Sequence, residues 1–194
     1  LKAIFNIPII ITIRDYWYIC PMIHLINSRG ENCIDNAHGD GCALCYKART
    51  IKHINNSPFL FWAGEFQARK AAWIRAINLT DMVIAVSPFL KDFYIRNGVD
   101  PDKIIVLSGG ILPQAVGTRK PKKRDNIFRI ALLGNATSIW GINLILDILA
   151  IWHDQNVRIK VWGNCSEQRI MQRVKKFDDA RLQFQGPYER EDIT

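Results

Sequence analysis

The stretch that decides the fold reads Met82-Val-Ile-Ala-Val-Ser87-Pro88, continues as Phe89-Leu-Lys-Asp-Phe-Tyr-Ile-Arg-Asn97-Gly98, and closes with Lys103-Ile-Ile-Val-Leu107. The first run is short, apolar and rich in β-branched residues, which is typical of a buried strand. Ser87 and Pro88 are favoured at the N-cap and first position of a helix, and Asn97-Gly98 favours a left-handed helix end. A second apolar strand follows at residues 104–107. The stretch predicts one βαβ unit, whose two strands pair in parallel.

A similar alternation begins again after a polar interruption. Residues 118–125 read Thr-Arg-Lys-Pro-Lys-Lys-Arg-Asp and show no apolar periodicity, which indicates a basic linker. Beyond it the pattern predicts strands and helices in turn, over 128–134, 141–153, 157–163, 166–177 and 182–186. We therefore expect an α/β protein with two Rossmann-like lobes and parallel sheets, divided into residues 1–112, a linker at 113–127, and residues 128–194. A ligand cleft is expected where the lobes meet.

The N-terminal segment predicts another strand with polar residues at its end. Ile4 to Ile13 is nearly continuous in apolar residues, consistent with a strand covered on both faces. Arg14-Asp15-Tyr16-Trp17 follows at the carboxyl end, the edge where ligands bind in open α/β sheets. The alternative is a strand-terminal turn with two packing aromatics.

Four cysteines gather in a loop-rich insert at residues 20–45. Cys42-Ala-Leu-Cys45 has the spacing with which two thiolates bind one metal ion, and Cys20 and Cys33 complete a tetrahedral set. Structural Zn²⁺ is one interpretation; partly buried thiols without metal and a redox pair are the others. His24 and His38 lie nearby in the sequence, and either one is a possible metal ligand in place of one cysteine. The spacing of the cysteines matches no common iron–sulfur signature.

A helix is predicted from Ser57-Pro58 to about Leu79, with Phe66, Trp73 and Ile77 on its apolar face. Core packing is the simpler role of this face. Docking on an acidic membrane surface is the alternative.

Composition limits the function classes. The 194 residues are 48% hydrophobic and 23% charged, with a net charge of +8 and a pI near 9.4. Anionic partners fit this charge, although it also fits a basic protein whose charges only solvate it. The interleaved arginines and aromatics of a nucleic-acid platform are missing, so no nucleic acid is expected. No apolar run approaches a membrane span, and five cysteines without secretory features indicate a reducing cytoplasm.

Glycine ends each of the three strands predicted in the second half, at Gly134, Gly163 and Gly186. A missing Cβ lets a nucleotide or phosphate approach the backbone, and the N-terminus of a following helix favours negative charge. Three glycines along one sheet edge predict a phosphate site better than any one of them does.

The sequence resembles the nucleotide-sugar-dependent glycosyltransferases of the two-lobed GT-B fold, of the retaining family 4 type. Thr12-Ile-Arg-Asp15-Tyr-Trp-Tyr-Ile-Cys20-Pro21 is similar to the family's T-x-H-D-x-W-x-x-C-P segment. Asp81 to Gly110 is similar to the stretch that closes the family's first lobe, and Phe128 to Gly186 to the opening of its second lobe. The resemblance implies an internal fragment that is inactive by itself, with both lobes incomplete.

The resemblance also implies the activity and its residues. A sugar would pass from a nucleoside-diphosphate sugar to a glycan or lipid-linked acceptor, in cell-surface polysaccharide synthesis at the inner face of the membrane. No catalytic cofactor is expected. Arg14 and Asp15 would face the reacting sugar as catalytic residues. The donor would be bound by residues of the second lobe, namely Gly134, Asn135, Trp140, Gly141, Gly163 and Gly186.

Three positions depart from the family pattern. Arg14 stands where the family has a histidine, and Asn135 and Trp140 stand where it has an arginine and a lysine that neutralise the donor diphosphate. Loss of both charges weakens stabilisation of the leaving diphosphate. A catalytically silent GT-B scaffold is therefore the alternative, and a zinc-dependent nucleic-acid binder is a third hypothesis.

Overall fold

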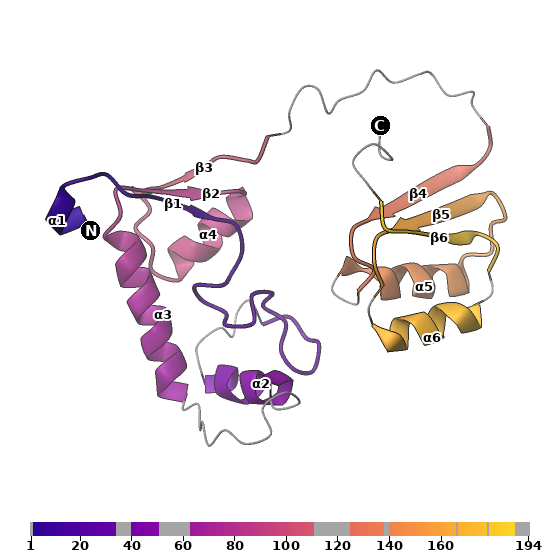
Figure 1. Cartoon of the computed structure of the whole chain (residues 1–194), viewed down its shortest axis with the longest axis horizontal. Helices are drawn as coiled ribbons and strands as arrows, with labels where there is room; N and C mark the ends of the chain where they lie inside the picture. The colour runs from indigo at the N-terminus through magenta and orange to yellow at the C-terminus, as the bar shows by residue number, and fades with distance from the viewer. Residues whose placement is uncertain are drawn as a thin grey trace. The chain divides into compact units, whose positions relative to one another are not determined.

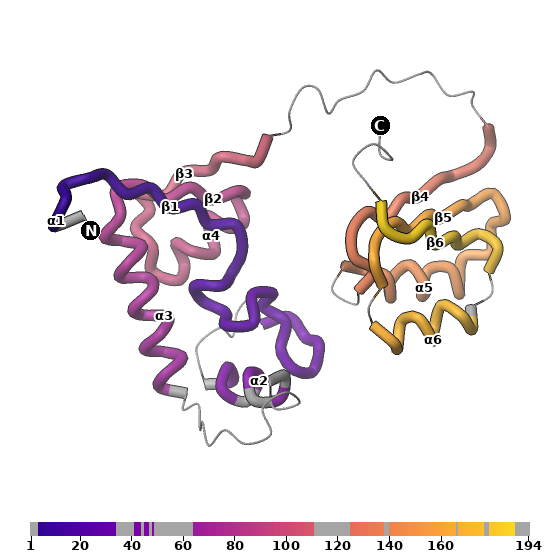
Figure 2. Tube along the Cα trace, viewed as in Figure 1, coloured from indigo at the N-terminus to yellow at the C-terminus, as the bar shows by residue number. Residues whose placement is uncertain are grey.

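The computed structural model describes residues 2–33, 40–50, 63–110, 125–137, 140–165, 167–177 and 179–188. The chain divides into two compact units, Leu1–Gly110 and Ile111–Thr194. Each unit holds one three-stranded parallel sheet, so the predicted α/β class with parallel sheets is confirmed (Figure 1, Figure 2). The exact lobe boundaries and the interlobe cleft stay predictions.

The first unit is built around a sheet with the strand order β1-β2-β3. Its elements are α1 (Lys2–Phe5), β1 (Ile10–Ile13), α2 (Asp40–Thr50), α3 (Ala63–Asn78), β2 (Met82–Ala85), α4 (Pro88–Arg96) and β3 (Ile104–Val106). The helix predicted from residue 57 corresponds to α3, although its predicted start lies outside the described residues.

The βαβ unit predicted from the central stretch is confirmed. Ser87 caps α4, because its hydroxyl accepts the N–H of Leu90 at 3.2 Å. Gly98 ends the helix with φ +102, and the N–H of Val99 donates to the Tyr94 carbonyl at 3.0 Å. This is a Schellman motif, in which the left-handed glycine lets the chain reverse toward β3.

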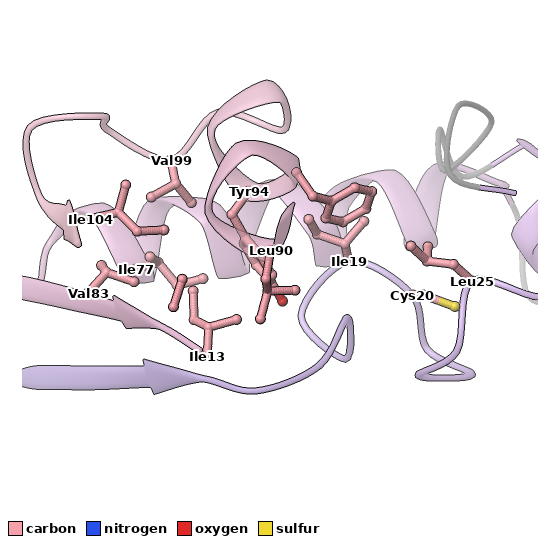
Figure 3. Packing of buried hydrophobic residues seen from close by; sticks show 12 residues of the cluster. Ile13, Ile19, Cys20, Leu25, Ile77, Val83, Leu90, Tyr94, Val99 and Ile104 are labelled. Carbon is pink, nitrogen blue, oxygen red and sulfur yellow. The ribbon is translucent and has the colours of Figure 1, made fainter. Parts of the chain in front are cut away.

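Side chains from α3, α4 and the sheet form the core of the first unit (Figure 3). Ile77 of α3 and Leu90 and Tyr94 of α4 meet Val83 of β2 and Ile104 of β3, and all five are at most 3% exposed. The alternate residues of the strands point away from this core. The helices therefore cover one face of the sheet. Because the three strands are parallel, their carboxyl ends lie together at one edge of it.

The strand predicted over residues 4–13 is wrong in two respects. The strand predicted over residues 4–13 is shorter, because residues 2–5 form α1 and pairing begins only at Ile10. Among the described residues this strand is not covered on both faces, because Ile10 is 59% exposed and Thr12 is exposed as well. The insert at 20–45, predicted to be loop-rich, is turn and loop over residues 20–33, and α2 begins within it at Asp40.

The second unit repeats the design with the strand order β4-β5-β6. Its elements are β4 (Phe128–Leu133), α5 (Ile142–Ile151), β5 (Val157–Trp162), α6 (Gln168–Phe177) and β6 (Leu182–Gly186). Both helices lie on the same side of the sheet (Figure 1). Ile142, Leu149 and Ile170 of the helices pack there with Val157 and Ile159 of β5.

A buried arginine ties the end of α5 to the sheet. Arg181 is 6% exposed, and its guanidinium donates to the carbonyls of Leu149, at 2.9 Å, and of Trp152. Its charge is paired with the Asp179 carboxylate at 2.6 Å. The cation thereby satisfies carbonyl groups that the helix end leaves unpaired.

In the described part of the chain, no helix has both the length and the apolarity needed to cross a membrane.

Candidate functional site

Three glycines lie next to one another at the carboxyl edge of the second sheet. Gly134 donates its N–H to the Trp162 carbonyl at 3.0 Å, and Gly163 donates to the Gly186 carbonyl at 2.7 Å. Their φ angles are +121 for Gly134, +128 for Gly163 and +79 for Gly186, values that L side chains rarely adopt. The three strand-end glycines of the sequence therefore do share one edge.

The glycines of this edge have different local surroundings. A Cβ on Gly163 would lie 2.0 Å from the carbonyl oxygen of Gly134, so β4 and β5 meet there only without a side chain. A Cβ on Gly134 or Gly186 would meet no atom of the described residues within 4 Å. Gly163 therefore allows the close approach of two strands, whereas Gly134 and Gly186 leave open space beside the backbone.

The loop after β4 leads from this edge into the N-terminus of α5. Ala136 anchors the loop, since it is fully buried and donates its N–H to the Asn164 carbonyl at 2.9 Å. Gly141 then caps α5 with φ +87 and offers no side-chain hydrogen bond to the first turn. The first N–H groups of a helix carry partial positive charge and bind anions. The glycine edge and this helix end together suit a phosphate group.

The side chains that the family pattern would make cationic are neutral and accessible. Asn135 is exposed, and Trp140 is 62% exposed. Sequence reasoning missed a cation close to the first turn of α5: Arg173 of α6 donates to the Asn143 side chain at 3.0 Å and pairs with Asp147. This contact joins two helices, so no spacing within one segment signals it.

Arg14 and Asp15 follow β1 at the carboxyl edge of the first sheet, and both are exposed. The Asp15 carboxylate accepts the N–H of Trp17 at 2.8 Å, and the Asp15 carbonyl accepts the hydroxyl of Tyr94 at 3.0 Å. Burial raises the pKa of Tyr94, so this hydroxyl keeps its proton and remains a donor. The segment is a fixed turn, and its catalytic role stays a prediction.

Arg69 of α3 holds the other side of this turn, which sequence reasoning did not foresee. Its guanidinium donates to the Trp17 carbonyl at 2.7 Å and to the Tyr18 carbonyl at 3.3 Å, and lies 4.9 Å from the centre of the Trp17 ring. Burial lowers the pKa of Arg69, while nearby sulfur atoms of Cys20 and Cys42 oppose that shift. Aromatic packing and a cation thus fix the turn from two directions.

A pocket of about 520 Å³ lies beside this turn, and all four cysteines of the insert line it. Cys20 is buried, and Cys33, Cys42 and Cys45 are half-buried. Within the described ranges, no three His, Cys, Asp or Glu side chains are placed closely enough to hold a metal ion. His24 is exposed, and His38 lies outside the described residues.

The structure thus brings the predicted residues together in two groups within separate units. Gly134, Gly163 and Gly186 share one edge, and Asn135, Trp140 and Gly141 lie in the loop between that edge and α5. Arg14 and Asp15 belong to the first unit, where Cys20, Cys33, Cys42 and Cys45 form a pocket of their own.

Comparison with known proteins finds likeness in structure only. No protein-family model matches the chain, and no curated protein matches its sequence. The chain is similar to HepE (Alr3699) of Anabaena in complex with UDP, with 18% identity and a TM-score of 0.50 over 64% of this chain and 38% of that one.

Two further structures give lower scores. HepE with UDP-glucose shows 19% identity and a TM-score of 0.48, over 64% of this chain and 38% of HepE. A mutant of TarM from S. aureus, in complex with fondaparinux, alpha-GlcNAc-glycerol and UDP, shows 15% identity and a TM-score of 0.48, over 69% of this chain and 26% of TarM.

The chain spans about two fifths of the length of HepE. At this level of identity the likeness concerns the fold alone. That fold is the α/β architecture of GT-B glycosyltransferases, with two parallel three-stranded sheets, as predicted from the sequence.

Proposed function

We propose that the protein takes part in sugar transfer from a nucleoside-diphosphate sugar to a glycan or lipid-linked acceptor. The observation that carries this proposal is the glycine edge of the second sheet. Among the described residues, Gly134 and Gly186 leave open space there, and α5, whose N-cap Gly141 makes no side-chain hydrogen bond to the first turn, begins one loop away. In open α/β sheets, ligands with phosphate groups bind at such an edge. HepE, which shares the fold, was solved with UDP bound.

In this proposal the backbone, rather than side-chain cations, holds the diphosphate. The N–H groups of Gly134 and Gly163 are used in the sheet, so the first turn of α5 supplies the donors. The glycines serve by leaving room for the phosphates. Asn135 and Trp140 border the site without adding charge, so the diphosphate should bind more weakly than it would with cations at these two positions.

Arg14 and Asp15 are proposed to face the reacting sugar in the complete protein. The turn that carries them is held by Arg69 and Tyr94, so their backbone is positioned before any substrate binds. Transfer is proposed to retain the anomeric configuration, with a donor phosphate oxygen helping to deprotonate the acceptor hydroxyl. A location in the cytoplasm at the inner face of the membrane, and a role in cell-surface polysaccharide synthesis, belong to the same proposal.

Calorimetric titration of the chain with UDP, UDP-glucose and uridine tests the donor site. We expect both diphosphates to bind and uridine to bind much more weakly. The double variant Asn135→Arg/Trp140→Lys should bind UDP more tightly, by roughly tenfold or more for each added cation. Gln183→Arg is the matched control, because it adds a charge to mid-strand β6, away from the glycine edge. Absence of UDP binding by both the native chain and the double variant, with both folded, would sink the proposal.

A catalytically silent GT-B scaffold is the second candidate, and the neutral Asn135 and Trp140 favour it. The two candidates differ in transfer activity rather than in fold. Sugar release and transfer should be measured with the complete native protein and with its Asn135→Arg/Trp140→Lys variant. Transfer by the native protein supports the enzyme, whereas transfer by the double variant alone supports the scaffold.

A further inference from the structure

Four cysteine side chains, two from a loop and two from α2, line one pocket of the first unit. Cys20 and Cys33 bracket a loop after the Asp15 turn, while Cys42 and Cys45 lie on α2. We propose that this pocket is a structural zinc site with all four thiolates as ligands, which fastens α2 to the loop. The proposal concerns the stability of the first unit and is independent of sugar transfer.

The donor set suits zinc in its chemistry and in the spacing of its cysteines along the chain. Cys42 and Cys45 are three residues apart on one helix, so their side chains lie on the same helix face. Cys33 is placed by its N–H, which donates to the Leu25 carbonyl at 2.8 Å, and Cys20 by its N–H to the Tyr16 carbonyl at 2.7 Å. Four thiolates at tetrahedral positions form the usual closed coordination shell of a structural zinc.

Two cations on α3 provide charge balance. Four thiolates around Zn²⁺ leave a net charge of minus two, which is costly beside a hydrophobic core. Arg69 interacts electrostatically with the sulfur atoms of Cys20 and Cys42, and Lys70 with that of Cys42. These two cations of α3 therefore lie near enough to the thiols to offset part of that charge, although neither of them lines the pocket itself.

The loop between Cys20 and Cys33 needs a tether of this kind. Ile23 has φ +71 and Leu25 φ +52, although neither is glycine. A β-branched residue in this conformation is strained and persists only where the surroundings impose it. Asn27 supports the far end of the loop, because its side chain accepts the N–H groups of Arg29 and Glu31. A metal bound by Cys20 and Cys33 would hold the strained end.

Zinc binding also implies a closure of the pocket. Among the described residues no three ligating side chains are close enough to share an ion, whereas zinc–sulfur bonds are about 2.3 Å long. The cavity of about 520 Å³ gives α2 the room to approach the loop. Metal loading should thus tighten the contact between α2 and the loop, as well as fill the site.

Metal analysis of the full chain, purified under reducing conditions, is the first test. We expect about one zinc per chain, and with Co²⁺ the intense visible bands of a tetrahedral thiolate site. Cys42→Ser and Cys45→Ser should each lower zinc affinity at least about a hundredfold. Cys165→Ser is the matched control, because Cys165 packs in the core of the second unit and should leave zinc content unchanged.

Variants that lose a ligand are also at risk of unfolding, so Cys45→His is made alongside them. Histidine is a zinc ligand, and this variant should keep the metal with altered Co²⁺ bands. Chelation of the native chain should lower the melting temperature of the first unit and increase proteolysis near α2. Native protein that is folded yet binds less than stoichiometric zinc, or that binds iron instead, would overturn the proposal. Equal loss of zinc in Cys165→Ser would overturn it as well.

Discussion

Gly163 is the residue whose replacement should most directly damage the glycine edge. In Gly163→Ala the new Cβ would lie 2.0 Å from the Gly134 carbonyl oxygen and 2.6 Å from its carbonyl carbon. Ordinary van der Waals contact begins more than an ångström farther away, and both atoms belong to backbone, which cannot rotate aside. The strands β4 and β5 must therefore separate at their carboxyl ends.

The expected cost of Gly163→Ala combines two effects. Alanine at φ +128 is strained by on the order of 1–3 kcal/mol. Separation of the strands also breaks the hydrogen bond from Gly134 to the Trp162 carbonyl, worth about 1 kcal/mol. Gly163→Ala should thus destabilise the second unit by about 2–4 kcal/mol. Gly134→Ala is the matched comparison, because it has similar strain at φ +121 but its Cβ would meet no atom within 4 Å in the part of the chain that the structure describes.

Urea denaturation followed by circular dichroism measures both variants against the native chain. The unfolding transition of the second unit should move markedly further in Gly163→Ala than in Gly134→Ala. Equal shifts in the two variants would refute the inference that Gly163 is required by close approach of the strands. No shift in either would refute the strain attributed to their φ angles.

Three further predictions concern stability. Arg181→Met should destabilise the second unit by about 3 kcal/mol, because it leaves the Asp179 carboxylate without its ion pair and buried carbonyls without their donor. Arg169→Met, at an exposed position, is the control and should change the stability little. The midpoints of urea denaturation of the two variants and the native chain measure this difference. A hydrogen bond from Arg181 lowers the pKa of Asp179, so the ionised carboxylate stabilises the fold above its unfolded pKa, and this stabilisation is lost below about pH 4. Asp179→Asn should therefore make the melting temperature depend less on pH in the acidic range. A pH dependence equal to that of the native chain would contradict this role of Asp179. Ser87→Ala should cost the first unit about 1 kcal/mol through loss of the cap to Leu90, with Ser87→Thr close to native in the same thermal melts; equal losses would argue against the cap.

Much of the fold was predictable because local patterns set it. β4, β5 and β6 occupy the residues that alternation and terminal glycines predicted, and α4 begins and ends at its predicted caps. β1 was predicted too long because apolar character alone does not separate a short helix from a strand, and the start of the run belongs to α1. α2 was missed because its residues have no clear apolar stripe and include Gly41 near the start.

The candidate site was predictable only in part, for a similar reason. Strand-end glycines meet at one edge whenever their strands are parallel neighbours, so the grouping of Gly134, Gly163 and Gly186 follows from topology. Contacts that join distant segments have no such signal. Arg69 lies 52 residues from the carbonyl of Trp17 that it binds, and Arg181 lies 32 residues from that of Leu149. Sequence spacing alone gave these two arginines no special role.

The central claim is that the carboxyl edge of the second sheet receives a nucleoside diphosphate. NMR titration of the ¹⁵N-labelled chain with UDP tests it residue by residue. We expect saturable shifts centred on the amides of Gly134, Gly163, Gly186 and the first turn of α5, with far smaller shifts on adding uridine. An unperturbed edge at saturating UDP, or shifts confined to other parts of the chain, would contradict it.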